Sequence, residues 1–323
     1  MINRKLSIIL TAFLCCCISI GAEVAKETHI YAIKGADTLR LDKYEQMDEA
    51  PSKPCLIFVF GGSFMRGERD HDDYKAFFKH FAEQGYAVVA IDYRLGLKDF
   101  SKKINTNQGK LKMFNAFVDL FSEAVGMAVE DLFDATGYVA QRATEWRIDT
   151  QRITTCGSSA GAVTVLQAEY ERCNHSPRSS SLPDGFRYAG VVSFAGAIFS
   201  EGKMAWQEKP APMLFFHGDA DKNVPYDRLK FLRFGLYGPK QLATQFDAMQ
   251  APYLFHTFEN AEHEIATVPM TQHLGEIEIF LHKYVNSKAN LRIRHTETAI
   301  GKPELKKKIK LKDCLDANFG EGQ

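Results

Sequence analysis

The sequence predicts an α/β fold with a mostly parallel central sheet, an antiparallel N-terminal edge and helices on both faces. Two observations predict it. Short continuous apolar runs, typical of strands buried on both faces, alternate along the chain with longer helical segments. Ahead of them, residues 28–44 alternate apolar and polar side chains around Gly35, which is a hairpin pattern. Because strands separated by helices pair in parallel, the hairpin supplies the antiparallel edge.

The expected elements follow in order from these runs. Buried strands are predicted at 55–60, 86–93, 152–156, 188–196, 212–218 and 253–258. Helices are predicted at 74–84, 114–144, 160–170, 226–236 and 268–285. The polar segments 94–112 and 171–187 lack periodicity and are expected to be loops, or part of a lid, that shape the substrate pockets.

The domain organisation is predicted to be simple. Residues 1–22 have the pattern of a signal peptide, with Arg4 and Lys5 before an apolar stretch and small residues at 21–22. This pattern predicts a secreted or periplasmic protein without a stable membrane span. The alternative is a lipoprotein signal, since three cysteines lie in the apolar stretch. No repeat or linker divides the remainder, so a single domain is expected over 23–290, followed by a C-terminal extension at 291–323.

Composition narrows the class of protein. Apolar residues make up 45% and charged residues 25% of the 323, with a formal net charge of zero, so neither disorder nor nucleic-acid binding is indicated. The basic run at 306–312 is interpreted as a solvated tail. Cys55 and Cys156 are expected to be buried thiols. Cys173 and Cys314 lie in polar stretches where a disulfide is possible in an oxidising compartment.

Two adjacent serines sit between the strand at 152–156 and the following helix. Their surroundings fit the pattern G-x-S-x-G only with Ser159 in the centre, between Gly157 and Gly161. A tight turn of this kind lifts the Ser159 side chain clear of the sheet and directs the Ala160 amide toward a bound ligand. The alternatives are Ser158 as nucleophile, or a Gly/Ser turn without chemistry.

A serine nucleophile needs a base and an orienting acid. The loop after the strand at 212–218 offers Asp219 and Asp221, and the loop after 253–258 offers His263. The chain order serine, aspartate, histidine is that of an α/β-hydrolase triad.

With these motifs, the chain resembles the α/β-hydrolase family over about residues 50–285. The stretch GDADKNVP is similar to the family's acid loop, and this resemblance implies Asp221 as the acid and Asp219 as a loop-capping carboxylate. The stretch AEHE around His263 lacks the glycines that usually precede the family's histidine. The other histidines of this region are expected to be structural or exposed, namely His217, His256, His273 and His282.

The loop FGGSF resembles the family's His-Gly-Gly-Gly loop, with Phe60 in place of the histidine. The resemblance implies an oxyanion hole formed by the amide of Ala160 together with that of Gly62 or Ser63.

The stretches at 92–96 and 130–153 are similar to a branch of secreted carboxylesterases related to hormone-sensitive lipase and to acetyl and feruloyl carbohydrate esterases. The resemblance implies ester hydrolysis through an acyl-enzyme, a small-molecule or carbohydrate ester as substrate, and no metal or cofactor. It implies that Arg94 and Glu130 are scaffold residues. The alternatives are a serine peptidase of the same fold and a non-catalytic binding protein.

Overall fold

A computed structural model describes residues 23–47, 50, 52–103, 109–298, 300–301 and 303–320. The predicted signal peptide at 1–22 lies outside the described residues. Within the described ranges, no helix combines the length and the apolar character needed to cross a bilayer.

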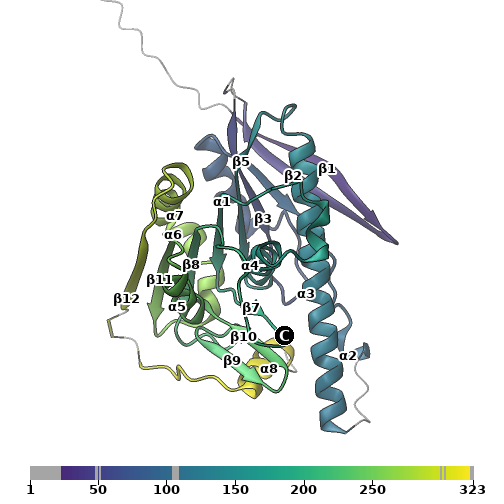
Figure 1. Cartoon of the computed structure of the whole chain (residues 1–323), viewed down its shortest axis with the longest axis vertical. Coiled ribbons are helices and arrows are strands. Elements are labelled where there is room, and N and C mark those ends of the chain that lie inside the picture. Colours follow the sequence, from purple (N-terminus) through teal and green to yellow (C-terminus); the bar gives the residue numbers. More distant parts are fainter. Residues whose placement is uncertain are drawn as a thin grey trace, which may run out of the picture.

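A nine-stranded sheet forms the centre of the described chain (Figure 1). Its spatial order is β1 (Val24–Lys34), β2 (Asp37–Gln46), β4 (Ala87–Ile91), β3 (Lys53–Val59), β5 (Ile148–Ser158), β6 (Gly190–Phe194), β8 (Met213–Gly218), β11 (Tyr253–Glu259) and β12 (Arg292–Thr298). The pairs β1–β2 and β2–β4 are antiparallel, and every other neighbouring pair is parallel. The predicted mostly parallel sheet with an antiparallel N-terminal hairpin is therefore confirmed.

Helices cover the sheet. They are α1 (Asp72–Glu83), α2 (Phe100–Lys103), α3 (Lys110–Gln141), α4 (Ala160–Cys173), α5 (Pro239–Met249), α6 (Pro269–Gln272), α7 (Leu274–Phe280) and α8 (Leu311–Phe319). The helix α1 contacts α6, while α3 contacts α4 (Figure 1). The strands β3, β4, β6 and β8 are almost wholly buried, as expected for apolar runs covered on both faces.

Arg94 and Glu130, which were expected to be scaffold residues, form an ion pair. Arg94 Nη2 lies 2.6 Å from Glu130 Oε2 and 2.8 Å from Asp131 Oδ1, and Asp131 is fully buried. Both carboxylates belong to α3. The pair therefore fixes the chain after β4 against the long helix.

The predicted helix at 226–236 is wrong. This stretch forms a hairpin of β9 (Arg228–Phe231) and β10 (Phe234–Tyr237), and β10 pairs with β7 (Ile198–Phe199) in a separate three-stranded sheet. A positive φ of 50° at Leu232 turns the chain between the two strands and is incompatible with a continuous helix. Because its pairing partner β7 is distant in sequence, no local pattern predicts the strand β10.

The predicted closing helix at 268–285 is interrupted. The chain leaves helical geometry at His273, which has φ −126° and ψ 33°, and α7 ends in a π-helical turn at Leu281–Asn286. The segment 171–187, expected to be irregular, contains a 3₁₀ turn at Pro177–Ser181 that packs against α3.

The C-terminal extension contributes two elements to the fold. Strand β12 pairs in parallel with β11 at the sheet edge, and α8 contacts β9 (Figure 1). The lysines at 306–308, 310 and 312 are exposed, as a solvated run requires.

The possible disulfide is absent. Cys173 and Cys314 are both free and both buried. Both lie on helices: Cys173 ends α4 beside Glu169, and Cys314 of α8 lies 3.2 Å from the Asn223 carbonyl.

Candidate active site

Ser159 stands at the turn between β5 and α4. Its φ of 51° and ψ of −116° lie in a region that non-glycine residues rarely adopt, and its amide donates to the Phe194 carbonyl at 2.9 Å. A Cβ at Gly157 would lie 2.4 Å from the Gly161 carbonyl, and one at Gly161 would lie 2.0 Å from the Val59 carbonyl. The two glycines are therefore required by the close approach of backbone at a strained turn.

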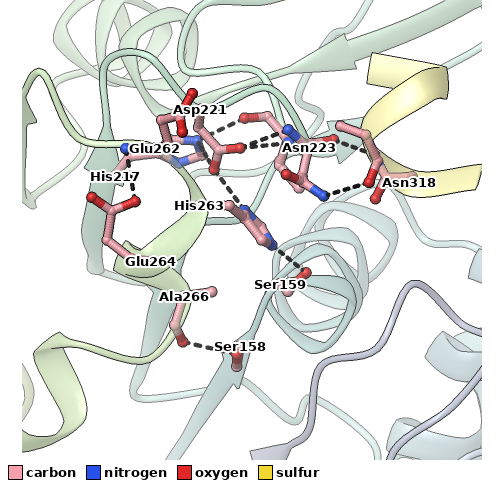
Figure 2. Close-up of polar contacts among 12 residues, drawn as sticks. Ser158, Ser159, His217, Asp221, Asn223, Glu262, His263, Glu264, Ala266 and Asn318 are labelled. Carbon is pink, nitrogen blue, oxygen red and sulfur yellow. Dashed lines mark hydrogen bonds and ion pairs between the residues drawn. The ribbon is translucent and has the colours of Figure 1, made fainter. Parts of the chain in front are cut away.

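The serine, the histidine and one aspartate predicted from sequence form a hydrogen-bonded chain (Figure 2). Ser159 Oγ lies 2.8 Å from His263 Nε2, and His263 Nδ1 lies 2.8 Å from Asp221 Oδ2. The three residues follow the C-terminal ends of β5, β8 and β11. Because these strands are parallel, their ends meet at one edge of the sheet and bring the three loops together.

Asp221 is fully buried, and both of its carboxylate oxygens accept hydrogen bonds. Its Oδ1 accepts hydrogen bonds from the amides of Asn223 at 2.8 Å and Val224 at 3.0 Å. Burial by itself raises the pKa of Asp221, but the charges and hydrogen bonds of its neighbours, His263 first among them, outweigh burial and hold this pKa below 3.8. The carboxylate is therefore ionised at neutral pH and accepts the His263 Nδ1–H.

His217 lies behind this aspartate. Its Nε2 donates to the Val224 carbonyl at 3.0 Å and lies 3.4 Å from Asp221 Oδ2. Burial lowers the pKa of His217, so the ring is neutral near pH 7. His217 braces the acid loop, which agrees with the structural part expected of it.

The two alternative residues make other contacts. Ser158 is buried, and its Oγ donates to the Ala266 carbonyl at 2.8 Å (Figure 2). Asp219 Oδ1 accepts from the Asn260 amide at 2.8 Å, and its Oδ2 lies 2.9 Å from Lys307 Nζ. Ser158 thus ties the serine turn to the histidine loop, and Asp219 caps the loop after β11.

The glycine loop after β3 lies against the serine turn. A Cβ at Gly61 would lie 3.0 Å from the Ser158 carbonyl, and Gly62 and Ser63 have positive φ values of 127° and 55°. Among the described residues, none accepts a hydrogen bond from the backbone amides of Gly62, Ser63 or Ala160. These three amides are available for an oxygen bound beside Ser159.

Phe60 stands where the resembled loop has a histidine. Its ring lies 4.4 Å from that of Tyr93, centroid to centroid, and Tyr93 Oη donates to the Phe60 carbonyl at 3.1 Å. Gly67 packs against the same ring, since a Cβ there would lie 2.6 Å from Phe60 Cδ2. Aromatic packing therefore supports the loop in place of a histidine.

Comparison with known proteins agrees with this architecture. The esterase 2 of Thermogutta terrifontis with propionate bound superposes with a TM-score of 0.56 at 20% identity, covering 83% of this chain and 95% of that one. Esterase B of Lactobacillus rhamnosis superposes with a TM-score of 0.58 at 14% identity, covering 83% and 88%. The chain has the α/β-hydrolase fold.

Two comparisons of sequence point the same way. The BD-FAE family model matches residues 41–105 of this chain. Gut esterase 1 of Caenorhabditis elegans is 29% identical over 134 residues, or 41% of this chain. Gut esterase 1 of Caenorhabditis briggsae is 28% identical over 153 residues. The chain spans 21% of the length of the first relative and 24% of the second.

Two hollows meet at Ser159. The first is an apolar cavity of about 40 Å³. Its walls come from α3, the start of α4, β10 and α8, with Phe117, Phe121, Val163, Phe234 and Phe319 among its lining residues. The second is an open, polar groove of about 740 Å³, bordered by the glycine loop, the start of α1 and the histidine loop. Ser63, Ser159 and Asn223 line both hollows.

The segments 171–187 and 94–112 do not have the place expected of them. Within the described residues, neither segment lines either hollow, so the expectation is wrong for 171–187 and for the described parts of 94–112. Residues 104–108 of the second segment lie outside the described residues. Phe100 acts indirectly, since its ring lies 4.8 Å from that of Phe319.

The helix α8 is the part of the site that sequence analysis missed. Asn318 Nδ2 donates to the Asn223 carbonyl at 2.9 Å (Figure 2). Asn318 Oδ1 accepts from Ser63 Oγ at 3.2 Å. One polar side chain therefore joins the glycine loop to the acid loop. Cys314 lies in the same cavity, but burial raises the pKa of its thiol to about 12, so no thiolate forms there at neutral pH. The sequence signal was a short amphipathic stretch, LKDCLDANF.

Proposed function

We propose that this protein is a serine carboxylesterase, with Ser159 as nucleophile, His263 as general base and acid, and Asp221 as the orienting acid. The observation that carries the proposal is the hydrogen-bonded chain Ser159–His263–Asp221, which lies beside amides without an acceptor among the described residues. The esterase names of its structural neighbours and of its sequence relatives support the same reaction.

The geometry accounts for each step. Ser159 Oγ attacks the ester carbonyl carbon while His263 Nε2 takes the hydroxyl proton, and Asp221 stabilises the imidazolium that forms. The carbonyl oxygen becomes an oxyanion beside the amide of Ala160, at the positive end of α4, and the amide of Gly62 or Ser63. The C–O bond to the alcohol breaks, and His263 protonates the departing oxygen. Water then attacks the acyl-enzyme through the same base and releases the acid.

The apolar cavity supports a short acyl group. The cavity of about 40 Å³ is small beside the groove of about 740 Å³ and is lined by aromatic rings, so it favours an acetyl to butyryl chain over a bulkier feruloyl group. The Thermogutta neighbour was solved with propionate and with butyrate bound, which agrees with a short-chain preference.

The polar groove supports a bulky, hydrophilic alcohol. It is far larger than the cavity, it is open to solvent, and charged side chains such as Arg66, Glu68 and Asp73 border it. In an acetylated sugar, the acetyl group suits the small apolar cavity and the sugar suits the large polar groove. We therefore propose an acetylated carbohydrate as the substrate class.

We also propose a secreted or periplasmic location, because residues 1–22 have the sequence pattern of a signal peptide.

The test is hydrolysis of 4-nitrophenyl acetate by the mature protein, by Ser159→Ala and by the matched variant Ser158→Ala. The proposal predicts turnover by the wild type, a loss of about 10⁵-fold or more in kcat for Ser159→Ala, and retained turnover for Ser158→Ala. A folded wild type without turnover on acetate and butyrate esters contradicts the proposal and favours a peptidase or a binding protein of the same fold.

A further inference from the structure

Three potential metal ligands converge at the edge of the sheet away from the serine turn. His256 lies in β11, His273 lies at the junction of α6 and α7, and Glu297 lies in β12. One ligand atom from each lies within 4.8 Å of the other two. Because the three residues come from separate segments, no ligand spacing in the sequence pointed to this cluster.

The distances suit a tetrahedral ion. His256 Nε2 lies 3.4 Å from Glu297 Oε2, and His273 Nε2 lies 3.9 Å from the same oxygen. Ligand atoms about 2.0–2.2 Å from a tetrahedral zinc ion lie about 3.3–3.6 Å from one another. The three ligand atoms all lie within 4.8 Å of one another, and movement of the partly buried His273 and the exposed Glu297 side chains brings the set to that geometry.

His256 supplies an independent observation. Its side chain is 96% buried, and Nε2 has no hydrogen-bond partner among the described residues. The ring is stacked on Phe258 at 4.4 Å between centroids, which fixes its orientation. A buried, unpaired ring nitrogen costs free energy unless a donor or a cation reaches it. Here it faces a carboxylate oxygen and a second imidazole.

His273 is oriented as a ligand would be. Its Nδ1 lies 3.1 Å from Glu276 Oε1, so a proton on Nδ1 donates to this carboxylate and leaves the lone pair on Nε2. Histidines that bind zinc commonly donate their other ring N–H to a carboxylate in this way. The arrangement selects the tautomer that binds a metal through Nε2.

We propose that His256, His273 and Glu297 bind one zinc ion, with a solvent molecule in the fourth position next to the exposed Glu297. Two imidazoles and one carboxylate form a donor set that favours zinc over magnesium or calcium. The ion joins the edge strand β12 to β11 and to the junction that follows the histidine loop. Its role is to stabilise the C-terminal part of the sheet, and it is independent of the proposed esterase reaction.

The test compares the purified full-length protein, stripped of metal with a chelator, with His273→Gln, Glu297→Gln and the control His282→Gln. His282 is an exposed histidine on the neighbouring turn and lies outside the cluster. Titration calorimetry with zinc chloride is expected to give one site per chain in the wild type and in the control. Each cluster variant is expected to bind at least about tenfold more weakly.

Thermal unfolding supplies the second measurement. Zinc at a concentration near the wild-type Kd multiplied by ten is expected to raise the Tm of the wild type and of His282→Gln by a few degrees, and to raise the Tm of the two cluster variants much less. Circular dichroism without zinc checks that the variants fold. Absence of a one-to-one site in the wild type, or equal binding by all four proteins, overturns the proposal and indicates adventitious zinc only.

Discussion

The two hollows beside Ser159 differ in size, polarity and origin. The acyl-side cavity is small and apolar and depends on α8, a helix close to the C-terminus. The groove on the other side is large, polar and open, and it is built mainly from the loop and helix that follow β3. The apolar cavity is therefore assembled from segments distant in sequence, whereas the polar groove is made largely of one contiguous stretch of chain. This difference predicts strict selection of the acyl group and loose selection of the alcohol.

The largest expected effect tests the chemistry that the two sides share. Asp221→Asn is expected to lower kcat for 4-nitrophenyl acetate by about 10⁴-fold, because an amide cannot hold the His263 Nδ1–H as a carboxylate does. Asp219→Asn, the matched control, is expected to lose less than about tenfold because Asp219 only caps the loop after β11. Steady-state kinetics decide this, and equal losses in the two variants contradict the assignment of the acid.

The second-largest effect tests whether the apolar cavity limits the length of the acyl group. Phe319→Ala removes a ring that lines the cavity and contacts Phe117, and it is expected to raise kcat/KM for a hexanoate ester relative to acetate by about 10–100-fold. Leu311→Ala, on the same helix but outside the cavity lining, is expected to leave this ratio unchanged. A chain-length series of 4-nitrophenyl esters measures the ratio. An unaltered profile in Phe319→Ala means that α8 does not limit the acyl group.

A smaller effect is expected where α8 positions the glycine loop. Asn318→Ala removes the acceptor for Ser63 Oγ and the donor to the Asn223 carbonyl, so kcat is expected to fall about tenfold with KM little changed. Asp316→Ala, at an exposed position of the same helix, serves as control. A change confined to KM instead points to a contact with the substrate.

The smallest effects belong to the groove. Arg66→Ala and Glu68→Ala change exposed side chains at its border and are expected to alter kcat/KM for acetylated oligosaccharides by a few fold, with no change for 4-nitrophenyl acetate. Release of acetate from the oligosaccharide measures the first rate. Equal effects on both substrates mean that the alcohol does not lie in the groove.

The contrast between the two hollows also explains which features the sequence predicted. The serine turn was predictable because backbone contacts at Gly157 and Gly161 exclude any side chain, so the glycines appear at fixed positions in a five-residue pattern. The buried parallel strands were predictable from continuous apolar runs. Asp221 and His263 were found because each follows directly on a buried strand.

The features that the sequence did not predict depend on contacts between segments that are distant along the chain. The stretch at 226–236 spaces its apolar residues in a way that suits a helix or a hairpin, and pairing of β10 with β7 decides between them. The position of α8 depends on hydrogen bonds such as that between Ser63 and Asn318, which lie 255 residues apart. A lysine-rich run before the helix gave no sign of this docking. The cluster of His256, His273 and Glu297 was hidden for the same reason.

The central claim, that Ser159 is the nucleophile between the two hollows, is tested most directly by covalent labelling. The mature protein is treated with paraoxon, which phosphorylates esterase 2 of Thermogutta terrifontis, and the tryptic peptide at 153–172 is sequenced by mass spectrometry. The account predicts a diethyl phosphate on Ser159, none on Ser158, and loss of the adduct in Ser159→Ala and Asp221→Asn. An adduct on Ser158, or no adduct on this peptide in a folded protein, contradicts it.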